Sequence, residues 1–473
     1  MKKQGFETFL YKEKGSLPEQ IWIVLSLSLP AILAQVTSIA MQYIDAGMVG
    51  SLGANATAAI GLVSSSTWLI GGTTIGLATG FSVQIAQMVG ARRYEDATNI
   101  LRQSFSVLLL IGLGIAFLGA GVSRFLPGWL GGQEEILADA GIYFFIYSCS
   151  VPFVMMRQLA SSMMQASGDM RTPGILSAMV CLLDVFFNML LIFPTRKTAI
   201  GTLSLTIPGA GLGVRGAALG TAFSDIIIAL IMLYMLCFRN QKLDLRKPGS
   251  WSWKRNTIET AARIAIPISL DQFFMCSAYI AATKIIAGIG TRAVAANSLA
   301  ITAESLCYMP GYGIAVAATT IIGQTIGANR RDLTKSFSRV IVILGMTLMG
   351  AAAVFMFIMA PVIFSLLTSD PQVAKLGTQV LRMELIAEPF YGASFCCAGI
   401  FRGAGDTFIP SMMNLCSMWG VRIILAFFLV PQLGLQGYWL AMTIELYFRG
   451  TIFLIRLIRG SWYRKSIFQS SVQ

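Results

Sequence analysis

The sequence predicts an all-α polytopic membrane protein with twelve transmembrane helices in two homologous six-helix lobes. Hydrophobic residues make up 55% of the 473 residues and charged residues only 12%, whereas soluble domains carry roughly 25% charge. The mean hydropathy is +0.70. Shifting the sequence against itself by 237 positions superimposes seven landmarks without a gap: Pro30 on Pro267, Gly53 on Gly290, Gly76 on Gly313, Gln87 on Gln324, Gly90 on Gly327, Asp169 on Asp406 and Pro173 on Pro410. A repeat carried by apolar segments indicates a duplicated membrane bundle.

Twelve apolar runs, each near or above the roughly 20 residues that cross a bilayer, follow one another along the chain. In the first half they lie near 21–48, 56–87, 104–126, 138–162, 173–194 and 212–238. In the second half they lie near 260–288, 293–325, 340–367, 377–401, 411–431 and 434–458. The first run is too long for the apolar core of a cleavable signal, so we expect it to be the first spanning helix. The repeat offset falls to 221 after Pro173, which leaves 16 additional residues in the first half, expected as the loop Arg196–Gly211.

The positive charges predict that both termini lie in the cytoplasm. With twelve spans, 23 Lys and Arg residues fall in segments on that side and six on the other, and short cytoplasmic loops are enriched in these residues. The predicted organisation is a cytoplasmic N-terminus at 1–20, an N-lobe at 21–238, a cytoplasmic linker at 239–256, a C-lobe at 257–459 and a cytoplasmic tail at 460–473. Six helices per half give parallel repeats, an arrangement that transporters use to rock around a central site.

The composition excludes several classes of function. The chain has no His, which excludes a Ser-His-Asp triad, a His-ligated metal or haem and a histidine proton switch. It has no G-x-x-x-x-G-K-[ST] motif, so we expect no ATP hydrolysis and no enzyme activity, and no strand is expected before the G-x-G-x-x-G match at Gly211–Gly216. The eight Cys form no C-x-x-C pair and are expected to pack against lipid or helices. The net charge of +13 lies in short clusters, so we expect no nucleic-acid partner.

Four motifs resemble those of the multidrug and toxic compound extrusion (MATE) transporters. They are Asp45-x-x-Met48-Val49-Gly50-x-Leu52-Gly53-Ala54, Gly80 with Gln87-x-x-Gly90-Ala91-Arg92-Arg93, Gly168-Asp169-x-x-x-Pro173, and Arg402-Gly403-x-Gly405-Asp406-Thr407. The resemblance covers both halves, roughly residues 20–455. It implies a central cleft and the efflux of organic, often cationic compounds in exchange for H⁺ or Na⁺, without a cofactor. We expect a monomer in the cytoplasmic membrane whose partners are small organic molecules and the lipid bilayer.

The candidate site residues of the first half are Asp45, Asp184 and Asn188. Ionisable side chains inside spanning helices are costly and usually face a cavity or a partner. A carboxyl group in such a place holds a proton more readily, and Asn188 lies one turn from Asp184 on the same helix face. MATE proteins resembling this chain carry an acid where Asp45 stands and often an Asn followed four residues later by an Asp, whereas here Asp184 comes first.

The candidates of the second half are Asp271, Glu304 and Glu388, which are expected either to bind a cation or to pair internally with Lys284 or Arg382. The Na⁺-coupled MATE proteins keep acids at positions that match Met275 and Tyr391, so their site is not reproduced and the sequence favours proton coupling. The remaining intramembrane charges considered, expected to be structural, are Asp225, Glu445, Arg422 and Arg449.

Pro30 interrupts the hydrogen-bond ladder of the first helix, and we expect it to act as a hinge or as a static kink. Some of the 24 Met residues, such as Met41, Met163, Met275 and Met309, suit an adaptable apolar pocket or ordinary lipid-facing packing.

The sequence leaves two alternatives to an antiporter. A lipid-linked oligosaccharide flippase of the wider superfamily would need a basic cleft for phosphate, which the number of intramembrane acids disfavours. A receptor or scaffold without transport activity is disfavoured by the duplication together with the buried charges.

Overall fold

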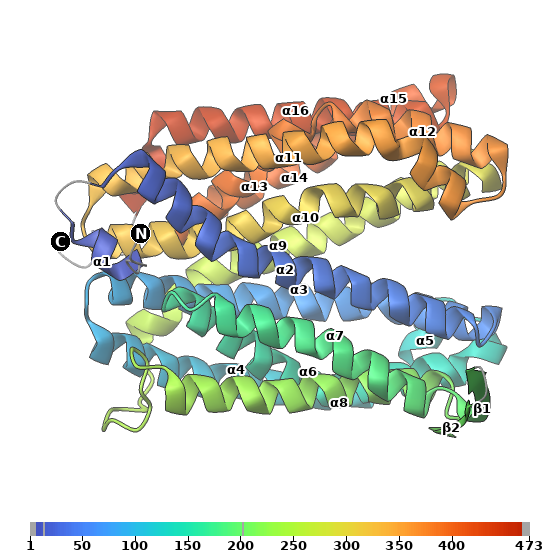
Figure 1. Ribbon diagram of the computed structural model, residues 1–473, viewed down its shortest axis with the longest axis horizontal. Coiled ribbons are helices and arrows are strands. Elements are labelled where there is room, and N and C mark those ends of the chain that lie inside the picture. Colours follow the sequence, from blue (N-terminus) through green and yellow to red (C-terminus); the bar gives the residue numbers. More distant parts are fainter. Residues whose placement is uncertain (1–5, 13–14, 201–202, 466–473) are drawn as a thin grey trace. The chain divides into compact units, whose positions relative to one another are not determined.

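The computed structural model describes residues 6–12, 15–200 and 203–465 and is built almost entirely of helices (Figure 1). The elements of the first half are α1 (Phe6–Leu10), α2 (Leu17–Gly50), α3 (Ala54–Gly90), α4 (Tyr94–Val122), α5 (Leu126–Trp129), α6 (Glu134–Ala166), α7 (Arg171–Leu191), β1 (Pro194–Ile200), β2 (Leu203–Ala210), α8 (Val214–Tyr234) and the π-helical turn η1 (Met235–Arg239). Those of the second half are α9 (Arg255–Ala287), α10 (Thr291–Gly327), α11 (Arg331–Leu367), α12 (Pro371–Leu385), α13 (Glu388–Gly403), α14 (Phe408–Ser417), the π-helical η2 (Met418–Ile423), α15 (Ile424–Leu433), α16 (Leu435–Arg459) and the 3₁₀ turn η3 (Ser461–Lys465).

Ten helices within these described ranges are long and apolar enough to cross a membrane. They are α2, α3, α4, α6, α7, α8 continued by η1, α9, α10, α11, and the continuous run from α14 to α15. The pair α12–α13 and the charged helix α16 complete the predicted set of twelve. The all-α membrane architecture predicted from the sequence is therefore confirmed.

The helix expected at 377–401 is broken in two between Leu385 and Glu388. Pro389 lies in the first turn of α13, where proline is tolerated, but it has no N–H for a bond to Leu385 and its ring crowds that carbonyl. The apolar run is continuous in the sequence, but the helix is not.

The loop expected at Arg196–Gly211 contains a β-hairpin, and the expectation that no strand precedes the G-x-G-x-x-G match at Gly211–Gly216 was wrong, because β2 ends at Ala210. Strands β1 and β2 pair antiparallel, with Pro194 opposite Ala210 and Ile200 opposite Leu203. The tip at 201–202 lies outside the described residues. Apolar and polar residues alternate along Leu203-Ser204-Leu205-Thr206-Ile207, which is a strand pattern.

The chain divides into two compact units. Unit 1 contains the described residues up to Gln35, the short stretch 86–93 and the chain from Glu259 on, whereas unit 2 contains 36–85 and 94–258. Helices α2 and α3 thus contribute to both units. The lobe boundaries expected at 21–238 and 257–459 stay a prediction.

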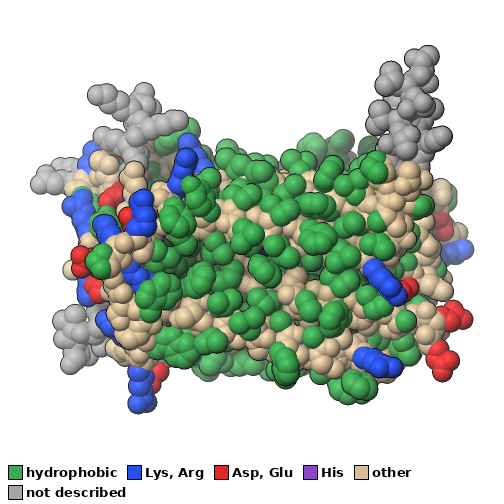
Figure 2. All heavy atoms as spheres, turned by 90° about the horizontal axis from the view of Figure 1, so that it is seen from below, with side chains coloured by type: hydrophobic (Ala, Val, Ile, Leu, Met, Phe, Trp, Pro, Cys, Tyr) green, Lys and Arg blue, Asp and Glu red, His purple; other side chains and the backbone are tan. Residues whose placement is uncertain are grey.

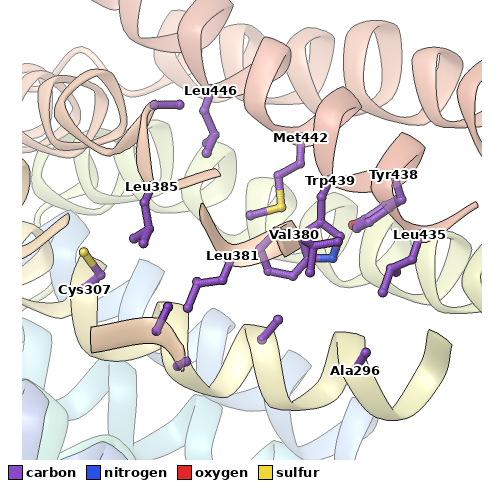
Figure 3. Packing of buried hydrophobic residues seen from close by; sticks show 14 of the residues in the cluster. Ala296, Cys307, Val380, Leu381, Leu385, Leu435, Tyr438, Trp439, Met442 and Leu446 are labelled. Atoms are coloured by element: carbon purple, nitrogen blue, oxygen red, sulfur yellow. The ribbon is translucent and has the colours of Figure 1, made fainter. Parts of the chain in front are cut away.

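Each unit is held by its own set of packed helices (Figure 1). In unit 2, α6 packs between α4 and α8, and α7 packs against α8. In unit 1, α10 contacts α11, α12 and α13, and α13 contacts α16. Figure 3 shows one core of unit 1, in which Val380 and Leu381 of α12 meet Trp439 and Met442 of α16. Trp439 is fully buried there, and its indole Nε1 donates to Asn297 Oδ1 at 3.0 Å, so the one polar atom of the ring is satisfied.

The predicted linker is folded against unit 2. The backbone N–H of Lys254 donates to Gln103 Oε1 at 2.9 Å, and Trp253 Nε1 donates to Ser106 Oγ at 2.9 Å. The Trp251 ring lies edge-on to Phe105 with centroids 6.4 Å apart. All three contacts are made to α4, so the linker is a structured part of unit 2.

The repeat is visible in the backbone as well as in the sequence. Gly53 and Gly290 both have positive φ, at 113° and 130°, and so do Gly168 and Gly405, at 96° and 82°. The two members of each pair are 237 residues apart. They lie at helix ends, in a backbone conformation that only glycine adopts without strain. Duplicate turns at equivalent places support the duplication inferred from the sequence.

The molecular surface suits a bilayer. Figure 2 shows one face covered by hydrophobic side chains, with charged side chains concentrated toward its two ends. Large apolar residues such as Phe117, Leu182 and Ile358 are more than half exposed. An apolar band flanked by charge is what a membrane-spanning surface presents.

Candidate functional site

Two carboxyl groups and one amide meet inside unit 2. Asn188 Nδ2 donates to Asp45 Oδ1 and to Asp184 Oδ2, both at 2.9 Å. Asp184 and Asn188 are 0% and 1% exposed, whereas Asp45 is partly buried. An amide nitrogen carries two hydrogens, so it supplies one to each carboxyl group. The structure brings the three candidate residues of the first half into one site, with Asp45 from α2 and the other two from α7.

The site keeps acceptor atoms to spare. Asp184 Oδ1 and Asn188 Oδ1 are buried and have no hydrogen-bond donor at ordinary geometry among the described residues. Thr221 and Ser224 of α8 bring hydroxyl groups close enough to interact with Asp184, but they donate to the backbone carbonyls of residues 217 and 221. Buried polar atoms are normally hydrogen-bonded, so an acceptor surplus here suits a bound proton or another small cation.

Close packing of α8 on α7 holds the Asn188 amide in place. A Cβ atom added at Gly220 would overlap Asn188 Oδ1, and one added at Gly216 would overlap the carbonyl oxygen of Leu191. Glycines four residues apart let two membrane helices approach this closely. The position of the amide between the two carboxyl groups therefore depends on Gly220.

We expect Gly220→Ala to reduce transport by about tenfold, because overpacking at such a contact costs roughly 1–3 kcal/mol and displaces the amide. Initial transport rates at matched protein amounts are the measurement. Gly61→Ala is the matched control, since a Cβ atom there meets nothing within 4 Å. Gly220→Ala should add little damage in an Asn188→Ala background; full additivity of the two changes would show that Gly220 does not act through Asn188.

Asp225 lies one turn after Thr221 on α8 and has a counter-charge of its own. Arg157 Nε of α6 lies 2.8 Å from Asp225 Oδ1. A cavity of about 20 Å³ beside this pair is lined by Tyr143, Tyr147 and Thr221, among others, and is large enough for one water molecule. The ion pair fits the structural role expected for Asp225.

In unit 1, Asp271 has an amide partner that the sequence analysis missed. Asn414 Nδ2 of α14 donates to Asp271 Oδ2 of α9 at 3.1 Å. The two residues are 143 positions apart, the same separation as Asp45 and Asn188. Each half thus pairs an acid on its first helix with an amide on its fifth. The shared spacing is the signal that would have identified Asn414.

Three of the four glutamates that are buried in the described part of unit 1 lie around the break between α12 and α13. Glu304 of α10 and Glu388 of α13 are 4% and 0% exposed, and Glu384 of α12, which the sequence analysis missed, is 0% exposed. Glu384 and Glu388 stand on the two sides of the break, and none of their carboxyl oxygens has a hydrogen-bond partner among the described residues. The predicted alternative partner Arg382 points elsewhere, because its Nε donates to the carbonyl oxygen of Phe357 at 3.0 Å.

Glu445 is clamped by two arginines. Arg422 Nη2 lies 2.6 Å from Glu445 Oε2, and Arg449 Nε lies 2.7 Å from Oε1. The Ser417 hydroxyl adds a hydrogen bond to Oε1. All three charged side chains are at most 6% exposed. The cluster joins α16 to the π-helical η2, whose widened turn carries Arg422, and it holds one more positive than negative charge.

Pro30 lies within the continuous helix α2, five residues before the border between the two units at Gln35 and Val36. A Cβ atom added at Gly313 of α10 would overlap the backbone of Ile32, so α2 lies directly against α10 just after the proline. The hinge at Pro30 stays a prediction.

Comparison with known proteins gives one consistent result. The profile of the MatE family matches residues 30–190 and 267–428, which is more than half of the chain and one match in each half. The chain is 26% identical over 473 residues to the probable multidrug resistance protein NorM of Thermotoga maritima, covering 99% of this chain and 98% of the relative. It is 24% identical over 437 residues to the probable multidrug resistance protein YoeA of Bacillus subtilis, covering 91% and 92%.

Solved structures share the fold. A MATE crystallised in complex with MaL6 superimposes with a TM-score of 0.87 at 22% identity, covering 98% of this chain and all of the other. A MOP superfamily transporter from Pyrococcus furiosus superimposes with a TM-score of 0.84 at 20% identity, covering 98% and 99%. The two profile matches and the full-length relatives agree with the helices and the repeat described above, and the chain belongs to the MatE family of multi-pass membrane transport proteins.

Proposed function

We propose that the chain is a secondary active antiporter that exports organic, often cationic compounds in exchange for protons. The observation that carries the proposal is the Asn188 amide donating to both Asp45 and Asp184 inside membrane-spanning helices. Two carboxyl groups so close together are costly to keep fully charged, and a bound cation relieves that cost. A proton and a cationic substrate that compete for this charge link export to import. Relatives described as probable multidrug resistance proteins support the substrate class.

The geometry of the site favours H⁺ over Na⁺. The Asn188 amide donates one hydrogen to each carboxyl group, and the side chains of Asp45 and Asp184 also lie close enough together to share a proton between them. Na⁺ requires several oxygen atoms pointing at one centre, whereas a proton needs only one free carboxyl oxygen such as Asp184 Oδ1.

Unit 1 offers a second candidate place for a cation. Glu384 and Glu388 carry free carboxyl oxygens at a broken helix, and broken helices supply backbone carbonyls to coupling ions in several transporters. Asp271 with Asn414 lies in the same unit. If the coupling ion binds here instead, changes at these acids will impair coupling more than changes in unit 2.

Aromatic rings beside the acids suit an organic cation. Tyr391 and Phe395 lie with ring centroids 4.5 Å apart, and the ring of Tyr308 stacks on Phe395 at 6.2 Å. Tyr308 follows Glu304 by one helical turn. Flat π faces attract delocalised cations more than anions, and the Tyr391 ring already faces one such cation, the Arg449 guanidinium, whose carbon lies 5.5 Å from the ring centre.

We propose a location in the cytoplasmic membrane with both termini inside, rocking lobes and a monomeric state. The positive-charge bias supports the orientation. A thiol introduced by Ser250→Cys in the linker, in a chain whose eight native Cys are replaced, should resist an impermeant maleimide in intact cells and react in inside-out vesicles. Reaction of this thiol in intact cells would show that the linker faces the outside and would contradict the proposed orientation.

Transport in proteoliposomes under separate gradients tests the proposal. Ethidium should move when a pH gradient is imposed without Na⁺, with the acid side opposite the substrate, and a Na⁺ gradient at constant pH should have little effect. Asp184→Asn should weaken the response to pH more than Asp271→Asn does. Ethidium transport that requires Na⁺, or a larger loss of transport in Asp271→Asn than in Asp184→Asn, would place the coupling ion in unit 1.

A further inference from the structure

The ends of α3 and α10 cross at two equivalent glycines. Gly90 ends α3 and Gly327 ends α10, and the two are 237 residues apart. A Cβ atom added at Gly90 would overlap the carbonyl of Gln324, and one added at Gly327 would overlap the carbonyl of Gln87. Gln87 Nε2 also donates to the carbonyl oxygen of Gly403 at 3.0 Å. The backbones of the two helices therefore touch, and each glycine makes room for the other helix.

Both helices leave this crossing through the same strained turn. Arg92 and Asn329, two residues after the glycines, have φ of 59° and 55°. Residues other than glycine rarely adopt this backbone conformation, and the conformation costs more free energy for Arg than for Asn. A turn that is held in this conformation at both equivalent places needs support from its surroundings.

The N-terminal segment Phe6–Lys12 supplies that support by contacting both turns. The Tyr11 hydroxyl donates to the carbonyl oxygen of Gly90 at 2.6 Å, and the Arg92 guanidinium carbon lies 3.7 Å from the centre of the Tyr11 ring. Partial burial raises the pKa of Tyr11 above its ordinary value, which by itself already keeps the hydroxyl protonated at neutral pH. At the other turn, Arg330 Nη1 donates to the carbonyl oxygens of residues 10 and 12 at 3.0 and 3.1 Å.

An apolar anchor fixes the same segment to α11. Phe9 and Leu10 are 2% and 1% exposed. The rings of Phe6 and Phe9 lie edge-on to Phe337, with centroids 5.8 and 5.7 Å away. The segment thus bridges the turn after α3, the turn after α10 and the first turns of α11.

All of these contacts lie within unit 1, but α3 does not. Residues 86–93 belong to unit 1, whereas the preceding part of α3 belongs to unit 2. The segment Phe6–Lys12 therefore holds the end of a helix whose body is part of the other unit. A rearrangement that carries the end of α3 away from α10 must first release this hold.

We propose that Phe6–Lys12 is a strap that keeps the ends of α3 and α10 together and must detach before the transporter opens on that side. The proposal rests on the proposed antiport cycle for its purpose, but the strap itself is testable without substrate or gradient. Detachment breaks the Tyr11 and Arg330 contacts at both turns in one step.

Thiol labelling at the crossing tests the strap. Thr325 near the end of α10 is fully buried, so the thiol introduced by Thr325→Cys in a chain without its native Cys reports opening when purified protein in nanodiscs meets a maleimide. Tyr11→Ala and Arg330→Ala should each raise the labelling rate about five- to tenfold, because the loss of an ordinary hydrogen bond makes the open state that much more populated. Tyr11→Phe, which keeps the ring under Arg92, should have a smaller effect.

Lys12→Ala is the matched control, because it removes only the exposed ion pair with Glu19 and leaves the carbonyl that Arg330 binds. Its labelling rate should equal that of the parent. Unchanged rates in both Tyr11→Ala and Arg330→Ala would overturn the strap, and so would an equal rise in Lys12→Ala, which would indicate general loosening. If the strap variants label faster but no antiport is found, the proposed function fails and the strap stands.

Discussion

Asp45→Asn is expected to abolish coupled export while leaving the protein in the membrane. The substitution keeps the size of the side chain and its ability to accept from Asn188 Nδ2, whose bond to Asp45 Oδ1 is 2.9 Å long. It removes the group that takes up and releases a proton or attracts a cationic substrate. Ethidium efflux at matched protein abundance is the measurement, and we expect a loss of at least a hundredfold, a range seen when an essential acid–base group is removed.

Glu134→Gln is the control for this substitution. Glu134 is an exposed acid in the first turn of α6, so its loss changes the net charge by the same amount outside the site. It should transport at the parent rate. Parent rates in Asp45→Asn as well, at normal abundance, would remove Asp45 from the mechanism.

Glu445→Ala is expected to be the most destabilising single change described here. It leaves Arg422 and Arg449 unpaired at sites where their side chains are 4% and 6% exposed. Removing one partner of a buried ion pair costs roughly 3–5 kcal/mol, because the remaining charge is uncompensated. The amount of monodisperse protein in detergent and its melting temperature should both fall sharply.

Two comparisons isolate the cause. Glu19→Ala removes a partly exposed partner of Lys12 and a hydrogen bond from the backbone N–H of Ser16, which together contribute only about 1–2 kcal/mol. Replacing Arg422, Glu445 and Arg449 together by Met, Leu and Met should restore much of the stability lost in Glu445→Ala, since neither arginine is then left without its partner. Parent-like melting of Glu445→Ala alone would contradict the structural role of the cluster.

The fold was predictable because each helix that spans a bilayer needs about 20 consecutive, mostly apolar residues. Runs of this kind occur in both copies of the repeat and located the twelve helices. The rule fails where a helix is interrupted inside an apolar run. Pro389 divides α12 from α13, and η2 widens the helix around Arg422; neither alters the hydropathy that defines a span. The hairpin β1–β2 was missed because it lies outside the repeat.

The site was predictable on α2 and α7 but less so elsewhere. Asp45, Asp184 and Asn188 stood out because polar residues in spanning helices are rare, and Asp184 and Asn188 share a helix face. Asn414 was overlooked because a single Asn in a helix is a weak signal until its spacing from Asp271 is compared with that of Asn188 from Asp45. Glu384 was overlooked because it belongs to a helix that was expected to continue into Glu388 without a break.

Proton movement driven by substrate alone tests the central claim most directly. Sealed proteoliposomes with a trapped pH dye, equal pH on both sides and no Na⁺ should show proton flux opposite to an imposed ethidium gradient. The flux should vanish in Asp45→Asn and persist in Glu134→Gln. Ethidium movement without proton flux, or proton flux that Asp45→Asn leaves intact, would contradict an antiport mechanism built on the Asp45, Asn188 and Asp184 site.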